Sequence, residues 1–368
     1  MTAPQLISFA RGAPSLDIVD VAGLKAAADR AFDLDPAAVT SYGPATGYEP
    51  LRQWIADRHG VEVDRVLVTN GSLQADAFLF EHLIRPGDDV VVERPTYDRT
   101  LLGLRNLGAR IHQVSLDSDG IDVDELRKLL ESGVRPALAH VIPNFQNPAG
   151  VTLSEARRRV LIDLAREYRF TIFEDDPYAE IRFRGEPLPS MLSLESDQDS
   201  SVVVHASSFT KTVCPGVRIG YLIGSAKLIA DIARRAVNTY ISPNMLAAVT
   251  VHQFCVGGSF EPSIATVRAA LAQRASLLAA ALRREIPGCR FHEPDGGYFL
   301  WVELPEDVDV DKLAPAATAR GVAVVRGTDF LLEGGHHALR LAFSAVTTDH
   351  VDEGVRRLAA AIADIRAA

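Results

Sequence analysis

The chain has 368 residues, of which 47% are hydrophobic and 23% are charged, and its formal net charge is −10. That length suits two domains, or one large domain with a smaller partner, in a globular protein. The negative balance and the lack of a basic stripe argue against a nucleic-acid partner, because binding phosphates requires clustered Lys and Arg side chains.

Cysteine usage and hydropathy narrow the class further. The cysteines, Cys214, Cys255 and Cys289, are too scattered for a disulfide framework, and the absence of a CxxC pair predicts no metal site. No apolar run approaches the roughly 20 residues that a membrane-spanning helix needs, and the N-terminus lacks the pattern of a signal peptide. The sequence therefore predicts a cytoplasmic protein without a membrane partner.

From residue 65 onward, short apolar runs alternate with segments of helical periodicity. This alternation predicts an α/β fold whose large domain has a mostly parallel sheet sandwiched by helices. The expected strands are 65–69, 90–93, 109–116, 137–143, 170–176, 201–206 and 217–224. The expected helices between them are 72–84, 97–108, 122–133 and 153–168.

The last third has a different pattern, which predicts a smaller α+β domain. A long helix is expected over 261–286, followed by short strands, a helix near 310–320 and a final helix that starts at VDEGVRR. We therefore divide the chain into a large domain over 41–255 and a small domain over 256–368. Residues 1–40 are expected to form an arm that packs with the small domain.

Polar side chains follow several of the expected strands. In α/β sheets, ligands bind beyond the carboxyl ends of parallel strands, so these residues are the first candidates for a functional site. The segments that this rule selects are NGSLQ, RPTY, NFQNP, DDPY and SSFTK.

The segment SSFTK contains a lone lysine, Lys211. A lysine amine can condense with an aldehyde once its pKa is lowered, although a lone loop lysine is more often a solvated surface residue. Ser208, Thr210 and Arg218 surround it in sequence and together can bind an anion such as a phosphate. The aldehyde cofactor that carries a phosphate is pyridoxal phosphate, and we take it as the working hypothesis.

Two further segments could contact the ring of such a cofactor. Asp175 could pair with the ring nitrogen, which must stay protonated for the ring to accept electrons. Tyr178 and Asn147 could donate to the phenolic oxygen of the ring. Each of these residues has a structural alternative, because Asp caps helices and an Asn-Pro pair forms turns.

The remaining two segments could hold the phosphate and the face of the ring. Gly71 and Ser72 lie at an expected strand-to-helix junction, where backbone N–H groups bind anions. Tyr97 could stack on the ring, although core packing is the usual role of a tyrosine. Each residue alone is weak support, but all five segments agree.

The chain resembles the fold-type-I pyridoxal-phosphate-dependent aminotransferases of class I/II over nearly its whole length. SSFTKTVCPGVRIGY is similar to the lysine signature of that family, FQNPAG and EDDPY to its cofactor-ring elements, and DGGYFLWVEL and ALRLAFS to its small-domain strands. ISFARGAPS, TNGSLQA and IPNFQNPAG are most similar to the subgroup with 2-aminoadipate aminotransferases, kynurenine aminotransferase II and the aminotransferase domains of MocR-type regulators. Because the pattern starts by residue 7, no DNA-binding segment is expected before it, which disfavours a regulator.

The resemblance implies a role for each matching position. It implies Lys211, Asp175 and Tyr97 as catalytic residues, and a homodimer in which Tyr42 of YGPATGYEPLR reaches the partner's phosphate. Leu73 stands where the subgroup usually has glutamine, and Arg11 where glycine is commoner. The implied cofactor-binding residues are Gly71, Ser72, Leu73, Tyr97, Asn147, Asp175, Tyr178, Ser208, Thr210, Lys211, Arg218 and Tyr42. The implied substrate-binding residues are Arg340, Asn147, Gly12 and Arg11.

The implied activity is transamination between an L-amino acid and a 2-keto acid in a ping-pong reaction. The same cofactor also serves lyases, decarboxylases, racemases and oxidases, so a β-lyase or an amino-acid oxidase is an alternative outcome. A third alternative, from another class, is a non-catalytic sensor that binds the cofactor. The sequence leaves open the donor, the acceptor and the contact that Arg11 makes.

Overall fold

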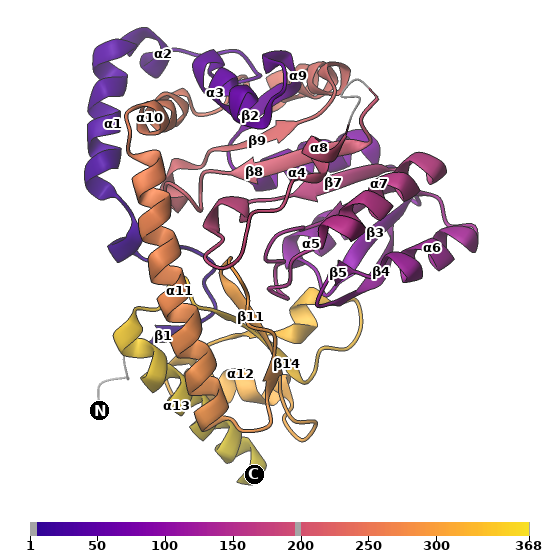
Figure 1. Cartoon of the computed structure of the whole chain (residues 1–368), viewed down its shortest axis with the longest axis vertical. Coiled ribbons are helices and arrows are strands. Elements are labelled where there is room, and N and C mark those ends of the chain that lie inside the picture. The colour runs from indigo at the N-terminus through magenta and orange to yellow at the C-terminus, as the bar shows by residue number, and fades with distance from the viewer. Residues whose placement is uncertain (1–5, 196–199, 368) are drawn as a thin grey trace.

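An eight-stranded sheet forms the centre of the larger part of the molecule (Figure 1). The computed structural model describes residues 6–195 and 200–367, so the first five residues of the expected N-terminal arm lie outside the described part. The strands, in the order in which they pair, are β2 (Val66–Thr69), β9 (Gly220–Ile223), β8 (Val203–Ser208), β7 (Thr171–Asp175), β6 (Pro136–Val141), β3 (Asp89–Arg94), β4 (Arg110–Asp117) and β5 (Gly120–Ile121).

Most pairs in this sheet are parallel, which confirms the predicted fold class. The run from β8 through β7, β6 and β3 to β4 is parallel throughout. Strand β9 lies antiparallel between β2 and β8, and the two-residue strand β5 pairs antiparallel with β4. The apolar residues of β3, β6, β7 and β8 are largely buried on both faces, as expected for a sheet covered by helices on each side, whereas β4, near the edge of the sheet, is mostly only partly buried.

Helices cover both faces of the large sheet. On one face α4 (Ser72–Leu83), α5 (Asp98–Asn106) and α9 (Ala226–Tyr240) pack on alternate strand residues. No helix of residues 6–195 and 200–367 has the length and apolar character needed to cross a bilayer. The other face carries α3 (Glu49–His59), α6 (Val123–Glu131), α7 (Glu155–Tyr168), α8 (Met191–Leu194) and α10 (Met245–Val256).

The smaller part has a four-stranded antiparallel sheet with helices packed on it (Figure 1). A short parallel pair joins β1 (Ile7–Ser8) to β12 (Val322–Ala323), so the start of the chain adds to this part. The sheet order is β10 (Arg290–Phe291), β11 (Phe299–Glu303), β14 (Ala338–Ala342) and β13 (Val325–Arg326), and the helices are α12 (Val310–Ala319) and α13 (Thr348–Ala367).

The two parts are joined by α11 (Phe260–Glu285), which extends from one to the other in Figure 1. Its first turns, with Phe260 and Ile264, belong to the core of the large sheet, and its later turns belong to the core of the small one. The N-terminal segment is also shared, because β1 pairs in the small part while α1 (Val21–Leu34) and α2 (Pro36–Thr40) pack on α10. The boundaries at 40 and 255 stay a prediction.

Candidate active site

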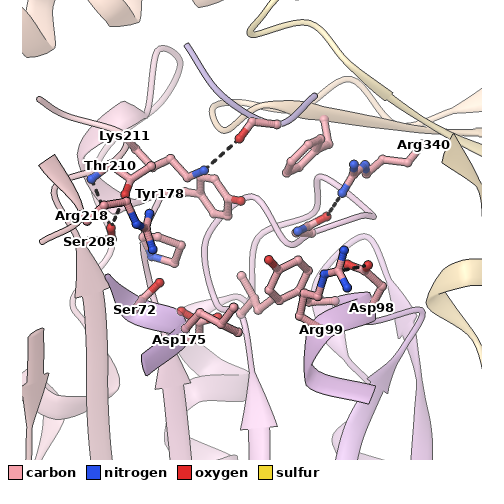
Figure 2. A pocket seen from close by; sticks show the side chains of 17 residues that line it. Ser72, Asp98, Arg99, Asp175, Tyr178, Ser208, Thr210, Lys211, Arg218 and Arg340 are labelled. Carbon is pink, nitrogen blue, oxygen red and sulfur yellow. Dashed lines mark hydrogen bonds and ion pairs between the residues drawn. The ribbon is translucent and has the colours of Figure 1, made fainter. Parts of the chain in front are cut away.

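A pocket of about 340 Å³ lies where the carboxyl ends of the parallel strands face the small part (Figure 2). Each of the five segments selected from the sequence contributes side chains to it. The small part adds residues of β11 and β14, and the N-terminal segment adds Gly12. The predicted site residues that line the pocket are Gly12, Ser72, Leu73, Tyr97, Asn147, Asp175, Tyr178, Ser208, Thr210, Lys211, Arg218 and Arg340.

Lys211 follows β8, and its side chain extends into the pocket beside Tyr178 (Figure 2). Its Nζ donates a hydrogen bond to the Gly12 carbonyl oxygen at 3.0 Å and lies 4.9 Å from the ring centre of Tyr298. Burial, aided by the positive charge of Arg340, lowers the pKa of Lys211 to about 8, although the carboxylate of Asp175 acts in the opposite direction. A neutral amine is therefore more accessible here than on a solvated lysine, which suits attack on a carbonyl carbon.

Asp175 ends β7 and forms part of the pocket floor. One carboxylate oxygen, Oδ2, lies 3.6 Å from Nε2 of His140 on β6. The other, Oδ1, is buried and has no hydrogen-bond partner among the described residues. An unpaired buried acceptor is costly, so this oxygen is suited to a protonated donor that enters the pocket.

Arg340 on β14 forms the other side of the pocket and is only 8% exposed. Its guanidinium carbon lies 4.4 Å from the ring centre of Phe299 and 4.9 Å from that of Phe330. Nη1 donates to Oδ1 of Asn147 at 3.1 Å, and Nη2 donates to the Ala10 carbonyl oxygen at 2.9 Å. Burial lowers the pKa of Arg340, but a guanidinium remains charged, so this fixed cation can bind a carboxylate.

The opposite end of the pocket is built around the first turn of α4. Gly71 caps this helix with φ of 87°, and a Cβ there would lie 2.3 Å from Nη2 of Arg218. Gly220 approaches just as closely, because its Cβ would lie 2.4 Å from the backbone nitrogen of Ser72. Only glycine at these positions lets the guanidinium and the helix N-terminus face the same space, where both attract an anion.

Hydroxyl groups complete this anion-binding end. Ser208 Oγ donates to Thr210 Oγ1 at 2.8 Å and accepts from the Thr210 backbone N–H. Arg218 itself has a left-handed backbone, with φ of 51°, and donates from Nη2 to the Asn70 carbonyl oxygen at 3.3 Å. Two hydroxyls, a guanidinium and a helix N-terminus together suit a phosphate.

These residues fit pyridoxal phosphate, the cofactor that the sequence indicates. The pocket contains an amine, an unpartnered buried carboxylate oxygen on its floor and an anion-binding cradle at one end. Tyr178 can donate from its hydroxyl, because burial, with the neighbouring Tyr97 and Asp175, raises its pKa well above the usual value. Burial also raises the pKa of Tyr97, to about 12.

The predicted site residues outside this pocket are Gly71, Arg11 and Tyr42. Gly71 lies directly beneath Arg218, while Arg11 is exposed to solvent. Tyr42 is 83% exposed and lines a separate, shallower hollow that it shares with Arg218, Asn70 and Leu246. Tyr42 therefore does not reach the Lys211 pocket of its own chain.

Sequence reasoning missed five pocket residues. Asp98 and Arg99 begin α5 directly after Tyr97, so the selected segment RPTY ends two residues too early. Phe299 lies in the small-domain strand GGYFLWVELP, whose apolar pattern indicates only core packing. The other two residues are Ile142, which has no sequence signal of its own, and Pro177, which lies within the selected segment DDPY but was not itself named as a candidate.

Comparisons with known proteins give a consistent result. Residues 4–358 match the sequence model of the family described as aminotransferase class I and II. The chain is 32% identical to aromatic-amino-acid aminotransferase 1 of Thermococcus litoralis, over 97% of this chain and 88% of that protein. It is 31% identical to 2-aminoadipate transaminase of Thermus thermophilus, over 98% of this chain and 90% of that protein.

A solved structure shows the same architecture with a cofactor derivative bound. The α-aminoadipate aminotransferase of Thermus thermophilus, in complex with N-(5′-phosphopyridoxyl)-L-leucine, superposes with a TM-score of 0.94 and 30% identity. The superposition covers 98% of this chain and 93% of that chain.

The fold and the pocket define a fold-type-I pyridoxal-phosphate enzyme. The chain belongs to aminotransferase class I and II, and the predicted resemblance to the 2-aminoadipate aminotransferase subgroup is confirmed. It is therefore a pyridoxal-phosphate-dependent transaminase, and the family does not favour the lyase, oxidase or sensor alternatives.

Proposed function

We propose that Lys211, Asp175 and Arg340 carry transamination between an L-amino acid and a 2-keto acid. The observation that supports this proposal most strongly is their placement around one pocket. The pocket is lined by the Lys211 amine, whose pKa is lowered, by a buried Asp175 oxygen without a hydrogen-bond partner among the described residues, and by the buried guanidinium of Arg340. A lysine with another role would not require both Asp175 and Arg340 to line the same pocket.

The proposed cofactor contacts follow from the chemistry of each side chain. Pyridoxal phosphate, when bound, supplies the carbonyl carbon that accepts the amino group and a ring that takes up the electron pair of the broken bond. Asp175 would hold the ring nitrogen in its protonated form, Asn147 and Tyr178 would donate to the phenolic oxygen, and Tyr97 would stack on the ring. The proposed phosphate contacts are Ser72, Ser208, Thr210, Arg218 and the backbone N–H group of Leu73. The Gly71 N–H, which the sequence also suggests, instead donates to the Thr69 carbonyl oxygen at 2.9 Å.

Lys211 has two proposed tasks. Its Nζ would hold the cofactor covalently. The free amine would take the proton from the α-carbon of the substrate as a general base. With a pKa of about 8, about one free Lys211 amine in ten is unprotonated at pH 7, against far fewer than one in a thousand for an unperturbed lysine.

Arg340 is the proposed anchor for the α-carboxylate of the substrate. A planar guanidinium held by Asn147, Phe299 and Phe330 can bind that group with two parallel hydrogen bonds. Keeping the carboxylate bound favours loss of the α-proton over decarboxylation. Gly12 would line the substrate from the side of Lys211, and Arg11 is the proposed contact for a substrate side chain.

The donor range is a matter for experiment, and the relatives indicate where to begin. Their names specify aromatic amino acids in one case and 2-aminoadipate in another. Arg99 and Asp98, which also line the pocket, offer one charge of each sign to a substrate side chain. A donor panel should therefore include aromatic, acidic and basic amino acids.

We also propose a homodimer, because Tyr42 can reach a phosphate only in a second copy of the site. Tyr42, Ile241 and Leu246 are exposed aromatic or aliphatic side chains, and Tyr42 and Leu246 line one hollow beside Arg218. Apolar surface of this kind is typical of a subunit interface. We further infer a cytoplasmic location, since the three cysteines are free and scattered.

A complementation experiment tests the shared site. Variants Lys211→Ala and Tyr42→Ala are mixed under conditions in which subunits exchange, and activity is compared with each variant alone. If Tyr42 serves the partner's site, mixed dimers contain one site with both residues intact, so about a quarter of all sites regain full function. Activity no higher than the sum of the two separate variants would contradict the shared site.

An absorbance spectrum tests the activity itself. The purified protein is mixed with single amino acids and no keto acid. The spectrum of the bound cofactor should change to that of its aminated form with a productive donor, and a 2-keto acid should restore it. Release of ammonia or peroxide would instead indicate a lyase or an oxidase, and no cofactor band would contradict the role of Lys211.

A further inference from the structure

A second buried carboxyl group, Asp76, lies behind the pocket on α4. It is 3% exposed, and its Oδ1 has no hydrogen-bond partner among the described residues. Asp76 follows Ser72 by four residues, and residues i and i+4 share one face of a helix. Since Ser72 lines the pocket, Asp76 lies on the same face of α4, one turn deeper in the protein.

Asp76 is an electrostatic neighbour of Asp175. Burial, followed by the negative charge of Asp175, raises the pKa of Asp76 well above its usual range. Asp76 and Asp175 are also both electrostatic neighbours of Tyr97, whose pKa is raised to about 12 by burial first and then by the charges of Asp98 and Asp175. Each of the two carboxyls has an unpartnered Oδ1, so neither has its full set of hydrogen bonds from the surrounding protein.

Two buried carboxyl groups that interact electrostatically cannot both be charged without a large electrostatic cost. Among the described residues, no Lys, Arg or His forms an ion pair with Asp76, whereas Asp175 faces His140 at 3.6 Å. The cheapest charge state therefore leaves the proton on Asp76 and the negative charge on Asp175.

The other titratable groups around the pair do not supply a cation to Asp76. Glu93 on β3 is itself buried, and burial raises its pKa to about 8, so it also stays largely protonated at neutral pH. The groups that interact with Asp175 from other elements are Tyr97 at the start of α5, Glu93 on β3, Tyr178 after β7, His205 on β8, Lys211 after β8 and His140 on β6.

We propose that Asp76 and Asp175 form a buried acid pair with one proton, held by Asp76, so that Asp175 is the single anion beneath the pocket. Asp76 is thus a positioning residue that acts on the pocket only through Asp175. The charge state of the pair depends only on residues of this chain. That Asp175 then places one negative charge opposite the ring nitrogen of the cofactor rests on the proposed function.

Infrared difference spectroscopy of the full-length protein tests the proposal directly, because a protonated carboxylic acid and a carboxylate absorb at different frequencies. The spectra of wild type and Asp76→Asn are subtracted at pH 7, with and without pyridoxal phosphate. In the absence of the cofactor, we expect the Asp76→Asn spectrum to lack the band of a protonated carboxylic acid that wild type shows. Glu93→Gln is the matched control, which should remove a band of its own and leave that of Asp76.

The dependence on Asp175 is the second readout. With Asp175→Asn, the neighbouring charge is gone, so Asp76 should lose its proton at a lower pH than in wild type. A band that titrates at the same pH in both proteins would show that Asp76 is a separate structural acid. The absence of any band assignable to Asp76 would overturn the proposal, because Asp76 would then not hold the proton.

The stability of the cofactor-free protein gives an independent check. An acid whose pKa is higher in the folded than in the unfolded state stabilises the fold most when protonated, and this contribution falls as pH rises above the unfolded value. Asp76→Asn should therefore gain melting temperature over wild type as pH rises from about 4 to 8. A constant difference across this range would contradict the proposal.

Failure of this inference and failure of the proposed function are distinguishable. Wild type that binds pyridoxal phosphate but shows no Asp76 band would retain the function and lose the acid pair. Wild type that shows the band but no cofactor absorbance would retain the acid pair and lose the function. Glu81→Gln, an exposed acid on the same helix, controls both measurements.

Discussion

The two arginines at the ends of the pocket differ in how much of their surroundings this chain supplies. Arg340 is buried, stacked between Phe299 and Phe330, and hydrogen-bonded to Asn147. Arg218 is exposed, and its one described hydrogen bond runs to the Asn70 carbonyl oxygen. A single chain thus completes the end proposed to bind the substrate carboxylate, while the end proposed to bind the phosphate is exposed to solvent.

This difference has a physical consequence. At the buried end, charge and orientation are fixed before any ligand arrives, so binding orders few groups there. At the open end, the hollow beside Arg218 is also lined by Tyr42, which is 83% exposed and does not line the Lys211 pocket of its own chain. Substitutions at the two ends should therefore affect substrate and cofactor separately.

The largest effect is expected between the two ends, at Lys211. Replacement by Ala removes both the covalent link and the general base, so kcat should fall by about 10⁴-fold or more. The measurement is single-turnover kinetics together with the cofactor spectrum. Lys227→Ala on α9, which removes an exposed lysine, should leave both readouts intact. Turnover that survives in Lys211→Ala would contradict the role of Lys211 and, with it, the assignment of this pocket as the active site.

Arg340→Lys should separate the substrate end from the cofactor end. An ammonium cannot form two parallel hydrogen bonds or stack on Phe299 and Phe330, so kcat/KM for the donor should fall by about 100-fold. The dissociation constant of pyridoxal phosphate should change little, which absorbance titration would show. Arg290→Lys, at an exposed position on β10, is the control. An equal loss of cofactor and substrate binding would contradict the division.

The large sheet and most of the pocket could be predicted because parallel strands produce strong sequence signals. Their apolar runs are largely buried on both faces, and their carboxyl ends collect polar residues at one edge, as for Asp175 and Lys211. The small part was harder, since β12 and β13 have two residues each and show no periodicity.

Residues that depend on tertiary closure could not be identified. The hydrogen bond from Arg340 to the Ala10 carbonyl oxygen joins positions 330 residues apart, and nothing local in either segment indicates it. Asp76 could not be identified from the sequence, because an aspartate in a helical pattern usually faces solvent. In the structure this aspartate is buried on α4. Helix α1 packs on α10 rather than on the small part, and its alanine-rich face gives no indication of its partner.

Gly71→Ala should weaken binding at the proposed phosphate end of the pocket, whereas Gly87→Ala, at another glycine with positive φ, should not. Gly71 and Gly87 both have a positive φ, of 87° and 88°, so an alanine at either position carries backbone strain of about 1–3 kcal/mol. Only at Gly71 would the new Cβ also meet Arg218, while at Gly87 nothing lies within 4 Å. We therefore expect both variants to lose melting temperature.

Cofactor affinity is the readout that separates the two glycine variants. Displacing the Arg218 guanidinium should weaken pyridoxal phosphate binding by about tenfold in Gly71→Ala, since a charged hydrogen bond contributes roughly 1.5–3 kcal/mol. Gly87→Ala should bind the cofactor as wild type does. Equal affinity in both variants would show that Arg218 contributes little at this open end.

The smallest expected effect is a gain, at Leu73. This side chain is 46% exposed at the mouth of the pocket, where a glutamine is usual in the subgroup that the sequence resembles. Leu73→Gln should add a side-chain hydrogen bond at the phosphate end and tighten pyridoxal phosphate binding about threefold, because a neutral hydrogen bond contributes roughly 0.5–1.5 kcal/mol. Leu102→Gln on α5 is matched in exposure, at 47%, and lies outside the pocket lining, so it should not tighten binding. Tighter binding in Leu73→Gln alone would show that the phosphate end can still be improved from within one chain. No change would mean that a partner subunit, rather than this residue, limits how well that end is completed.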